Sequence, residues 1–503
     1  MAHPTQHDSH TPGFLPFRAL AEKPSRWIGL AALMAWADLL LCFEGVLRDQ
    51  VLEQGGLVHD PFFLGLTAAA AATLGLFTLL RKALQGRQMA ERLLRPNALM
   101  GFAALGALVS AAAVGLTSVA QAVDAWAPAL LGVVAGIAAA LLTLGWARLL
   151  GTLDLRAALL MVSLAAALQW LALVAIALTG PVAHLALVLA MPVGAGWALR
   201  HNLHGEEVAV RLPSPAAASR VGGPLARLSL AMLVFSLVAQ FVWCFFIKML
   251  PGRLEVGLFP AVFATVAATT VGVAALCALV MEHQRGYRLE LYYRAAFLFC
   301  LGGVTATGMA AADLSQAELL ASYTAVYAGY SLLGPTMWML VLGYAFTRKE
   351  SAASVASAVF GCQYLGLFAG FWLVERLESS TMPSGDASAL GAIAVFAGSI
   401  LLATAYVGLF PERSLLSLSP RLFGMSPASV EDRCRQLAQT RGLTPRELEV
   451  LTLLARGRDA GFIGDELGIS RNTVNVHRKA VFAKLGVHSQ QELLSAVEGV
   501  DAE

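Results

Sequence analysis

The chain has 503 residues, of which 57% are apolar and 14% are charged, and its mean hydropathy is +0.67. A soluble globular protein carries about 25% charged residues, so this composition excludes a wholly soluble fold and predicts that most of the chain lies in a lipid bilayer. The net charge of +2 excludes nothing by itself, because the charged residues are segregated along the chain.

The first 25 residues are polar and interrupted by prolines, which predicts a disordered N-terminus. His3, His7 and His10 leave a metal-binding tail as the alternative for this segment. The apolar run that follows is too long, and too soon followed by others, for a cleaved signal peptide. The six cysteines have no metal or redox spacing. We therefore expect no cofactor and no metal site in the rest of the chain.

Twelve apolar runs follow the N-terminus, each close to the roughly 20 residues that a membrane-spanning helix needs. Their approximate bounds are 27–47, 61–80, 97–117, 127–147, 157–177, 181–199, 228–249, 256–280, 295–312, 321–346, 353–374 and 388–410. The sequence therefore predicts twelve spans.

Basic residues concentrate in the loops that follow the even-numbered spans. Five lie between residues 81 and 96, after the second span, and three lie between 281 and 294, after the eighth. Because cytoplasmic loops are enriched in Lys and Arg, this pattern predicts that both termini are cytoplasmic.

A longer polar segment, 200–227, separates two groups of six predicted spans, 26–199 and 228–410. It is rich in Pro, Ala and Gly, which is typical of a linker. Six spans, a cytoplasmic joint and six more resemble the layout of the major facilitator superfamily, whose halves are related repeats with a site between them at mid-membrane. That superfamily pairs an Asp with a Gly-Arg cluster after span two. Gly86-Arg87 is present here, but the Asp is not, which argues against active transport.

Polar side chains inside the predicted spans are candidates for ligand sensing, because such groups are costly in lipid and often mark function. Asp38 lies near the middle of the first span, and Gln169 is a further pocket candidate. For Asp38 the alternative is a structural pairing inside the bundle, and for Tyr327 it is interhelical packing. The ligand-sensing candidates are Asp38, Glu44, Gln240, Tyr327 and Gln363. The spans contain no nucleophile–base pair or phosphate loop, so we expect no enzymatic activity.

Residues 411–440 contain several Ser and Pro and predict a second linker, with a polar stretch at 430–439 that is compatible with a helix. A compact domain follows at 441–503. Thr444-Pro445-Arg446-Glu447 is a capping box with proline at the first helical position. Further helix starts at Asp459, Ser470 and Ser489 complete a predicted set of four helices.

The second and third of these helices, 459–467 and 471–485, are joined by a short turn that contains Gly468. The third carries four basic residues and no acidic one, which is typical of a helix that enters a major groove. The domain as a whole has eight basic and nine acidic residues. Its affinity for phosphates must therefore come mainly from this helix, and should be modest in a monomer.

Three segments resemble the LuxR-type helix-turn-helix family. They are Thr-Pro-Arg-Glu-Leu-Glu-Val-Leu at 444–451, Leu-Gly-Ile-Ser-x-x-Thr-Val-x-x-His at 467–477, and Lys-Leu-Gly-Val-x-Ser at 484–489. The resemblance implies a homodimer that contacts through the fourth helix and binds a two-fold site in double-stranded DNA. It also implies that the central positions of the third helix read bases, at Asn475, Val476 and Lys479. By the same resemblance, Thr473, His477 and Lys484 contact the DNA backbone or position the helix.

The predicted DNA-binding residues are Arg471, Thr473, Asn475, Val476, His477, Arg478, Lys479 and Lys484. Two positions depart from the family. Gly464 stands where Ala is usual and costs about 1 kcal/mol of helix stability, so the second helix is expected to be loose until DNA or a dimer orders it. Gln490 stands where Arg is usual and removes a phosphate contact. The alternative is a degenerate domain that no longer binds DNA.

Together these features predict an all-α protein, with a twelve-helix polytopic membrane bundle of six plus six helices and a C-terminal four-helix LuxR-type domain. The main hypothesis is a one-component transcriptional regulator in the cytoplasmic membrane of a bacterium. Its bundle would sense a small molecule, an ion or a membrane state. One alternative is a major-facilitator-like transporter with a regulatory DNA-binding tail. Another is a membrane scaffold that tethers DNA without switching.

Overall fold

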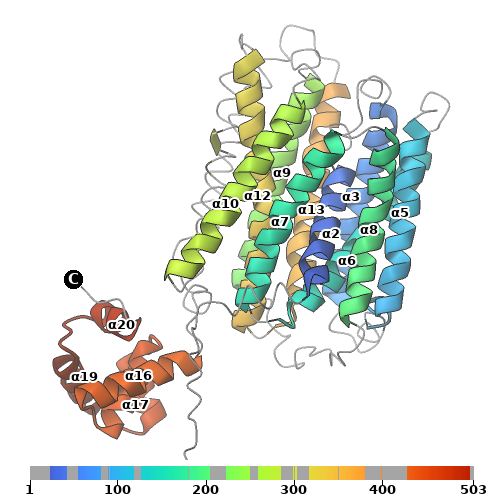
Figure 1. Ribbon diagram of the computed structural model, residues 1–503. Coiled ribbons are helices and arrows are strands. Elements are labelled where there is room, and N and C mark those ends of the chain that lie inside the picture. Colours follow the sequence, from blue (N-terminus) through green and yellow to red (C-terminus); the bar gives the residue numbers. More distant parts are fainter. Residues whose placement is uncertain are drawn as a thin grey trace, which may run out of the picture. The chain divides into compact units, whose positions relative to one another are not determined.

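The computed structural model describes most of the chain and divides it into two compact units, residues 1–418 and 419–503. All the elements that it describes are α-helices (Figure 1). The described residues are 23–41, 55–80, 89, 91–117, 126–153, 155–178, 181–203, 223–249, 259–284, 298, 301–302, 316–348, 350–379, 398 and 427–498.

The first unit is a bundle of long apolar helices. They are α2 (Pro24–Leu41), α3 (Gly55–Leu80), α5 (Pro96–Thr117), α6 (Trp126–Leu150), α7 (Leu155–Ala177), α8 (Pro181–Leu203), α9 (Gly223–Met249), α10 (Phe259–Gln284), α12 (Gln316–Arg348) and α13 (Ala352–Ser379). Ten of the predicted spans correspond to these helices. The predicted spans at 295–312 and 388–410 lie largely outside the described residues.

Five helices in the described part of the chain are long and apolar enough to cross a membrane. They contain the segments Asp60–Leu80, Pro96–Leu116, Trp126–Leu150, Ala157–Ile176 and Ala352–Arg376. In lipid, a helix satisfies its backbone hydrogen bonds internally, which is why such apolar sequences form helices here. The first unit is therefore a multi-pass membrane bundle.

Glycines allow two helix pairs of this bundle to approach closely. Gly132 and Gly136 of α6 face α3, and Gly366 and Gly370 of α13 face α9. A Cβ placed on any of these four glycines would lie between 2.0 and 2.5 Å from a backbone carbonyl oxygen of the facing helix. Small residues spaced by four positions permit this packing in membranes.

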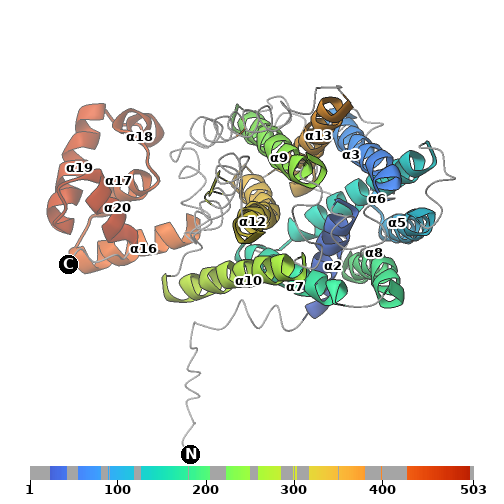
Figure 2. The same ribbon diagram turned by 90° about the horizontal axis from the view of Figure 1, so that it is seen from above.

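Helices from the two halves of the bundle pack directly on each other. α3 and α13 lie side by side in both views (Figures 1 and 2), and α7 contacts α10. The ring of Phe63 on α3 stacks on that of Phe371 on α13, with centroids 4.7 Å apart. The Thr78 hydroxyl donates a hydrogen bond to Ser357 Oγ at 2.8 Å. These contacts join the first six-helix segment to the second.

The second unit contains α16 (Pro427–Arg441), α17 (Pro445–Ala455), α18 (Ala460–Leu467), α19 (Arg471–Leu485) and α20 (Gln490–Glu498). The last four correspond to the four helices predicted from the capping patterns. Their apolar faces meet in one core, in which Val450 and Leu451 of α17 and Val474 and Val481 of α19 are fully buried.

The second linker is shorter than predicted, because α16 belongs to this core. Val430 and Cys434 are 9% and 0% exposed within it, and Leu437 packs against it. Burial raises the pKa of the Cys434 thiol to about 11. The expected linker at 411–440 is therefore wrong over its last part. Only a narrow stripe of α16 is apolar, so the sequence of this segment is too polar overall to predict a helix of the core.

Candidate nucleic-acid interface and intramembrane cavity

The turn between α18 and α19 is fixed by two capping residues. Gly468 has a φ of +64°, a left-handed conformation that glycine adopts without a steric penalty, and it ends α18. Ser470 begins α19, because its hydroxyl accepts a hydrogen bond from the Thr473 backbone N–H at 3.1 Å. The two helices are therefore joined by three residues whose geometry is set by the local sequence.

α19 has one buried face and one solvent-facing face. Val474, Val481 and Leu485 point into the core. On the other side, Val476 is 65% exposed. Of the predicted DNA-binding residues, Asn475 and His477 are half-buried and the others are exposed: Arg471, Thr473, Val476, Arg478, Lys479 and Lys484.

An ion pair attaches the end of α19 to the start of α17. Lys484 Nζ lies 2.7 Å from Glu447 Oε2 and donates a second hydrogen bond to the Gly442 carbonyl at 3.1 Å. Glu447 is only 6% exposed, and its carboxylate also accepts a hydrogen bond from the Thr444 backbone N–H at 2.7 Å. Lys484 and these hydrogen bonds hold the pKa of Glu447 below its usual value. Lys484 thus positions α19 within the fold.

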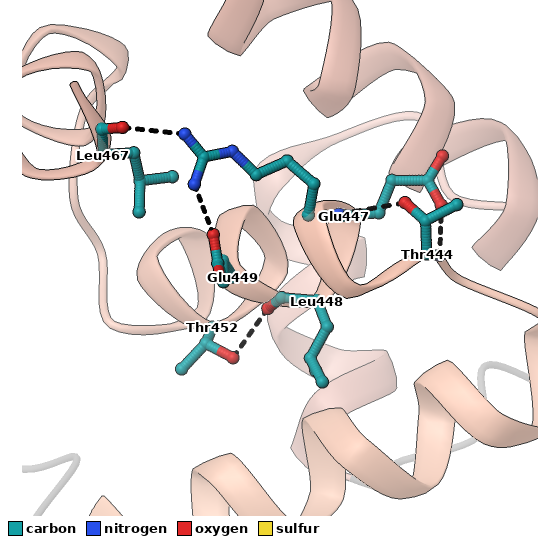
Figure 3. A network of polar contacts seen from close by, with 7 residues as sticks. Thr444, Glu447, Leu448, Glu449, Thr452 and Leu467 are labelled. Atoms are coloured by element: carbon teal, nitrogen blue, oxygen red, sulfur yellow. Dashed lines mark hydrogen bonds and ion pairs between the residues drawn. The ribbon is translucent and has the colours of Figure 1, made fainter. Parts of the chain in front are cut away.

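Figure 3 shows how the same end of α17 also holds α18. The Thr444 hydroxyl accepts a hydrogen bond from the Glu447 backbone N–H at 3.3 Å, which completes the predicted capping box. Arg446 donates to Glu449 Oε2 at 2.6 Å and to the Leu467 carbonyl at 2.7 Å. A cation at the last carbonyl of a helix is favourable. Arg446, which sequence reasoning treated only as part of the capping box, therefore joins α17 to α18.

A cavity of about 80 Å³ lies inside the membrane unit. It is lined by α2, α6 and α7 from the first half of the bundle and by α12 and α13 from the second. Its polar side chains come from all five helices: Asp38, Thr143, Gln169, Ser331, Gln363 and Tyr364. Pro335, inside α12, also lines it. The cavity is therefore shared between the two halves.

Asp38 and Gln169 form the polar centre of the lining. Gln169 Nε2 donates a hydrogen bond to Asp38 Oδ2, which connects α7 to α2. Gln169 is 4% exposed, and its carbonyl oxygen Oε1 has no hydrogen-bond partner among the described residues. A buried acceptor without a partner is costly. Thr143 and Ser331, which sequence reasoning did not select, also line the cavity, and only the tertiary structure brings them there.

The sensing candidates do not all meet at one place. Asp38 and Gln363 line the cavity. Gln240 does not, because its Nε2 donates to Cys244 Sγ one turn along α9, at 3.0 Å. Tyr327 does not either, because its ring packs edge-on against Trp170, with centroids 5.3 Å apart. Gln240 and Tyr327 are therefore not among the described residues that line this cavity, and their part in ligand sensing stays a prediction. Glu44 lies outside the described residues.

The C-terminal unit matches a known protein family in sequence, in addition to its helix-turn-helix geometry. The family described as "Bacterial regulatory proteins, luxR family" matches residues 441–497. These residues form a LuxR-type helix-turn-helix domain. The HTH-type transcriptional activator RamA of Corynebacterium glutamicum is 33% identical over 79 residues, which is 14% of this chain. The chain spans 28% of the length of that relative.

The membrane unit is similar to solved transporters. The human organic anion transporter MFSD10 (TETRAN) has a TM-score of 0.52 at 14% identity, over 78% of this chain and 99% of its own. A bacterial homologue of the iron transporter ferroportin, in an outward-facing state, has a TM-score of 0.50 at 14% identity, with the same coverage. At this identity the similarity shows the fold alone. The membrane unit has a major-facilitator-like transporter fold, and the predicted fusion with a LuxR-type domain is confirmed.

Proposed function

We propose that this protein is a one-component transcriptional regulator whose sensor is its membrane bundle. The observation that carries the proposal is the presence, in one chain, of a LuxR-type domain at 441–497 and a transporter-like unit with a polar internal cavity. A DNA-binding domain acts where the chromosome is. The protein therefore lies in the cytoplasmic membrane of a bacterium with both termini in the cytoplasm, as the basic loops indicate.

In this proposal α19 is the recognition helix. Asn475 and Lys479 hydrogen-bond to base edges, and Val476 contacts a thymine methyl group, because amide, amine and apolar groups are what major-groove readout uses. Arg471 and Arg478 contact phosphates, which fix the register on the duplex. Thr473 and His477 lie beside them on the same helix.

Two further parts of the domain support binding. Lys484 acts through Glu447, by holding α19 against α17, rather than by reading bases. The domain binds a two-fold DNA site as a homodimer through α20, as the LuxR-type fold implies. Weak binding by one domain would make dimerisation the step that a signal can control.

The cavity supplies the means of sensing. Its walls come from both halves of the bundle, so a ligand that binds one arrangement of the halves more tightly shifts the population toward that arrangement. The shift then changes dimerisation of the DNA-binding domain or its access to DNA. A ligand with equal affinity for both arrangements would change nothing.

A transporter with a regulatory DNA-binding tail is the second candidate. The observation that favours it is the similarity to solved transporters over 78% of the chain. The two functions differ in what the LuxR-type domain does for the membrane unit. A transporter moves its substrate without that domain, whereas a sensor has no output without it.

Occupancy of chromosomal DNA by the full-length protein, together with a reporter gene at the bound sites, tests the proposal. We expect Lys479→Ala to lower occupancy. We expect Asp38→Asn to leave occupancy in place and to hold the reporter permanently on or off. The absence of any preferred chromosomal site would contradict the regulatory function. Sustained substrate uptake into cells by a chain that lacks 441–503, with no effect of Asp38→Asn on the reporter, would establish the transporter instead.

A further inference from the structure

We propose that the cavity recognises a small organic cation with N–H donors, of which a protonated primary or secondary amine is the simplest case. The inference rests on the proposed sensing function, because it names the ligand class of the same cavity. Three features support it: the charge of the lining, an acceptor without a hydrogen-bond partner among the described residues, and the aromatic residues beside them.

The charge of the lining favours a cation. Among the described residues that line the cavity, Asp38 is the one carboxylate, and none of them is Lys, Arg or His. Asp38 is half-buried, and a carboxylate in a medium of low dielectric constant is unfavourable without an opposite charge beside it. A ligand with a positive charge beside Asp38 would remove that cost. An anionic ligand would add a second negative charge to it.

Gln169 adds a requirement for a hydrogen-bond donor. Its Nε2 is already used in the hydrogen bond to Asp38, so the amide is oriented with its carbonyl oxygen unused. That oxygen is buried and lacks a partner among the described residues. A carboxylate and an amide oxygen side by side are both acceptors. An ammonium group could donate to the two together, which neither an anion nor an ether or ketone could do.

The aromatic residues indicate that the cation is organic. Trp338 and Phe360, from α12 and α13, both line the cavity, and their ring centroids are 4.8 Å apart. Tyr364 lines it one turn along from Phe360. Aromatic faces attract cations and also cover the apolar part of a ligand. The rings of Trp338 and Phe360 would add nothing to the shell of oxygen ligands that an inorganic ion needs, so their place in the lining favours an organic cation.

The size of the cavity limits the ligand. Its volume of about 80 Å³ is several times the roughly 10–15 Å³ that one water molecule needs on the same measure. A ligand of a few non-hydrogen atoms fits that space, whereas a large lipophilic cation would require the two halves to move apart.

Binding of matched probes to the purified full-length protein in lipid nanodiscs tests the inference, with calorimetry as the readout. The probes are n-butylammonium, its neutral counterpart butan-1-ol, its anionic counterpart butyrate, and n-butyltrimethylammonium, which keeps the charge but has no N–H donor. We expect n-butylammonium to bind at least about tenfold more tightly than butan-1-ol, since a charged hydrogen bond contributes that much. We expect butyrate not to bind, and n-butyltrimethylammonium to bind more weakly than n-butylammonium.

Variants assign the effect to the two residues. Asp38→Asn should remove the preference for n-butylammonium over butan-1-ol, and Asp38→Glu should keep it. Gln169→Met should weaken the binding of n-butylammonium and leave the binding of n-butyltrimethylammonium unchanged, because the variant loses only the acceptor for an N–H donor. Glu91→Gln, which removes an exposed carboxylate outside the cavity lining, is the matched control and should change nothing.

Equal binding of n-butylammonium and butan-1-ol, tighter binding of butyrate, or an ammonium preference that survives Asp38→Asn would each overturn the inference. So would a failure of n-butylammonium to bind at all. None of these measurements involves DNA, so the ligand class and the regulatory function fail separately. Ammonium binding without any change in reporter output would contradict sensing and leave the ligand class standing. A reporter response to a neutral or anionic compound would contradict the ligand class and leave the sensing function standing.

Discussion

Lys484 Nζ and Glu447 Oε2 lie 2.7 Å apart, although the two residues are 37 positions apart in the sequence. The pair connects the C-terminal end of the recognition helix α19 to the first turn of α17. Glu447 is the acid of the capping box that begins α17, so one carboxylate both starts a helix and holds another in place. The orientation of α19 therefore depends on a residue that lies outside it.

Replacing Lys484 should destabilise the C-terminal unit. Lys484→Met leaves the Glu447 carboxylate, 6% exposed, without its cation. Because Lys484 itself is partly exposed, we expect a loss of about 1–2 kcal/mol in the free energy of unfolding. Urea unfolding of the fragment 427–503 measures it. Arg435→Ala, on the exposed side of α16, is the control and should change stability by less than about 0.5 kcal/mol.

The same pair predicts a dependence of stability on pH. The folded-state pKa of Glu447 is lowered from its ordinary value of 4.5, so its contribution is fully present above pH 4.5 and is lost as the pH falls through the lower, folded-state pKa. Glu447→Gln should therefore make the decline in stability below pH 4.5 shallower. Glu492, whose pKa is lowered by hydrogen bonds from His488 and Ser489, contributes in the same direction, so the decline should not vanish. An unchanged decline in Glu447→Gln would contradict the assignment.

DNA binding should depend on Lys479 in a sequence-specific way. Lys479→Ala should weaken binding to the preferred site by about 1–3 kcal/mol and relax the base preference at one position. Fluorescence anisotropy with the fragment 427–503, on specific and scrambled duplexes at two salt concentrations, separates the two effects. Arg435→Ala should leave both unchanged. If Lys479→Ala weakened binding to the specific and the scrambled duplex by the same factor, Lys479 would contact a phosphate and would not read a base.

Removing α16 should unfold or weaken the DNA-binding domain. A fragment that begins at 441 lacks Val430 and Cys434, which are buried in the core. Each buried apolar side chain contributes about 1.5–3 kcal/mol, so we expect the free energy of unfolding to fall by about 3 kcal/mol against the fragment 427–503. Equal stability of the two fragments would show that α16 is dispensable, as the sequence alone suggested.

The contact between α3 and α6 should not tolerate a methyl group at Gly136. A Cβ there would lie 2.2 Å from the Leu66 carbonyl oxygen, so Gly136→Ala must push the two helices apart. We expect a lower midpoint of thermal unfolding in detergent and less correctly folded protein. Gly115→Ala is the matched control, because a Cβ at Gly115 meets nothing within 4 Å. A control as damaging as Gly136→Ala would point to helix propensity or handling rather than close packing.

The transmembrane orientation can be tested with reporter fusions. Fusions after Arg95, Arg220 and Glu503 should report the cytoplasm, because the basic loops lie on that side. Fusions within 49–60 and 375–386 should report the outside. A C-terminus on the outer side would contradict regulation of cytoplasmic DNA altogether.

Local sequence determined the elements of this protein. The capping box at Thr444 and the cap at Ser470 place the starts of α17 and α19 where the sequence predicts them, because a cap depends on atoms within one helical turn. In the same way, runs of apolar residues predict ten of the described helices of the bundle, since a span must satisfy its own backbone hydrogen bonds whatever its neighbours are.

Tertiary structure decided which side chains meet. Asp38 and Gln169 are 131 residues apart, and Lys484 and Glu447 are 37 apart, so no local pattern joins them. Gln240 looked equivalent to Gln363 in sequence, but α9 directs it to Cys244 and α13 directs Gln363 to the cavity. The rotation of each helix about its axis sets these partners, and in an evenly apolar membrane helix the sequence carries little information about that rotation. Close packing against the neighbouring helices fixes it instead.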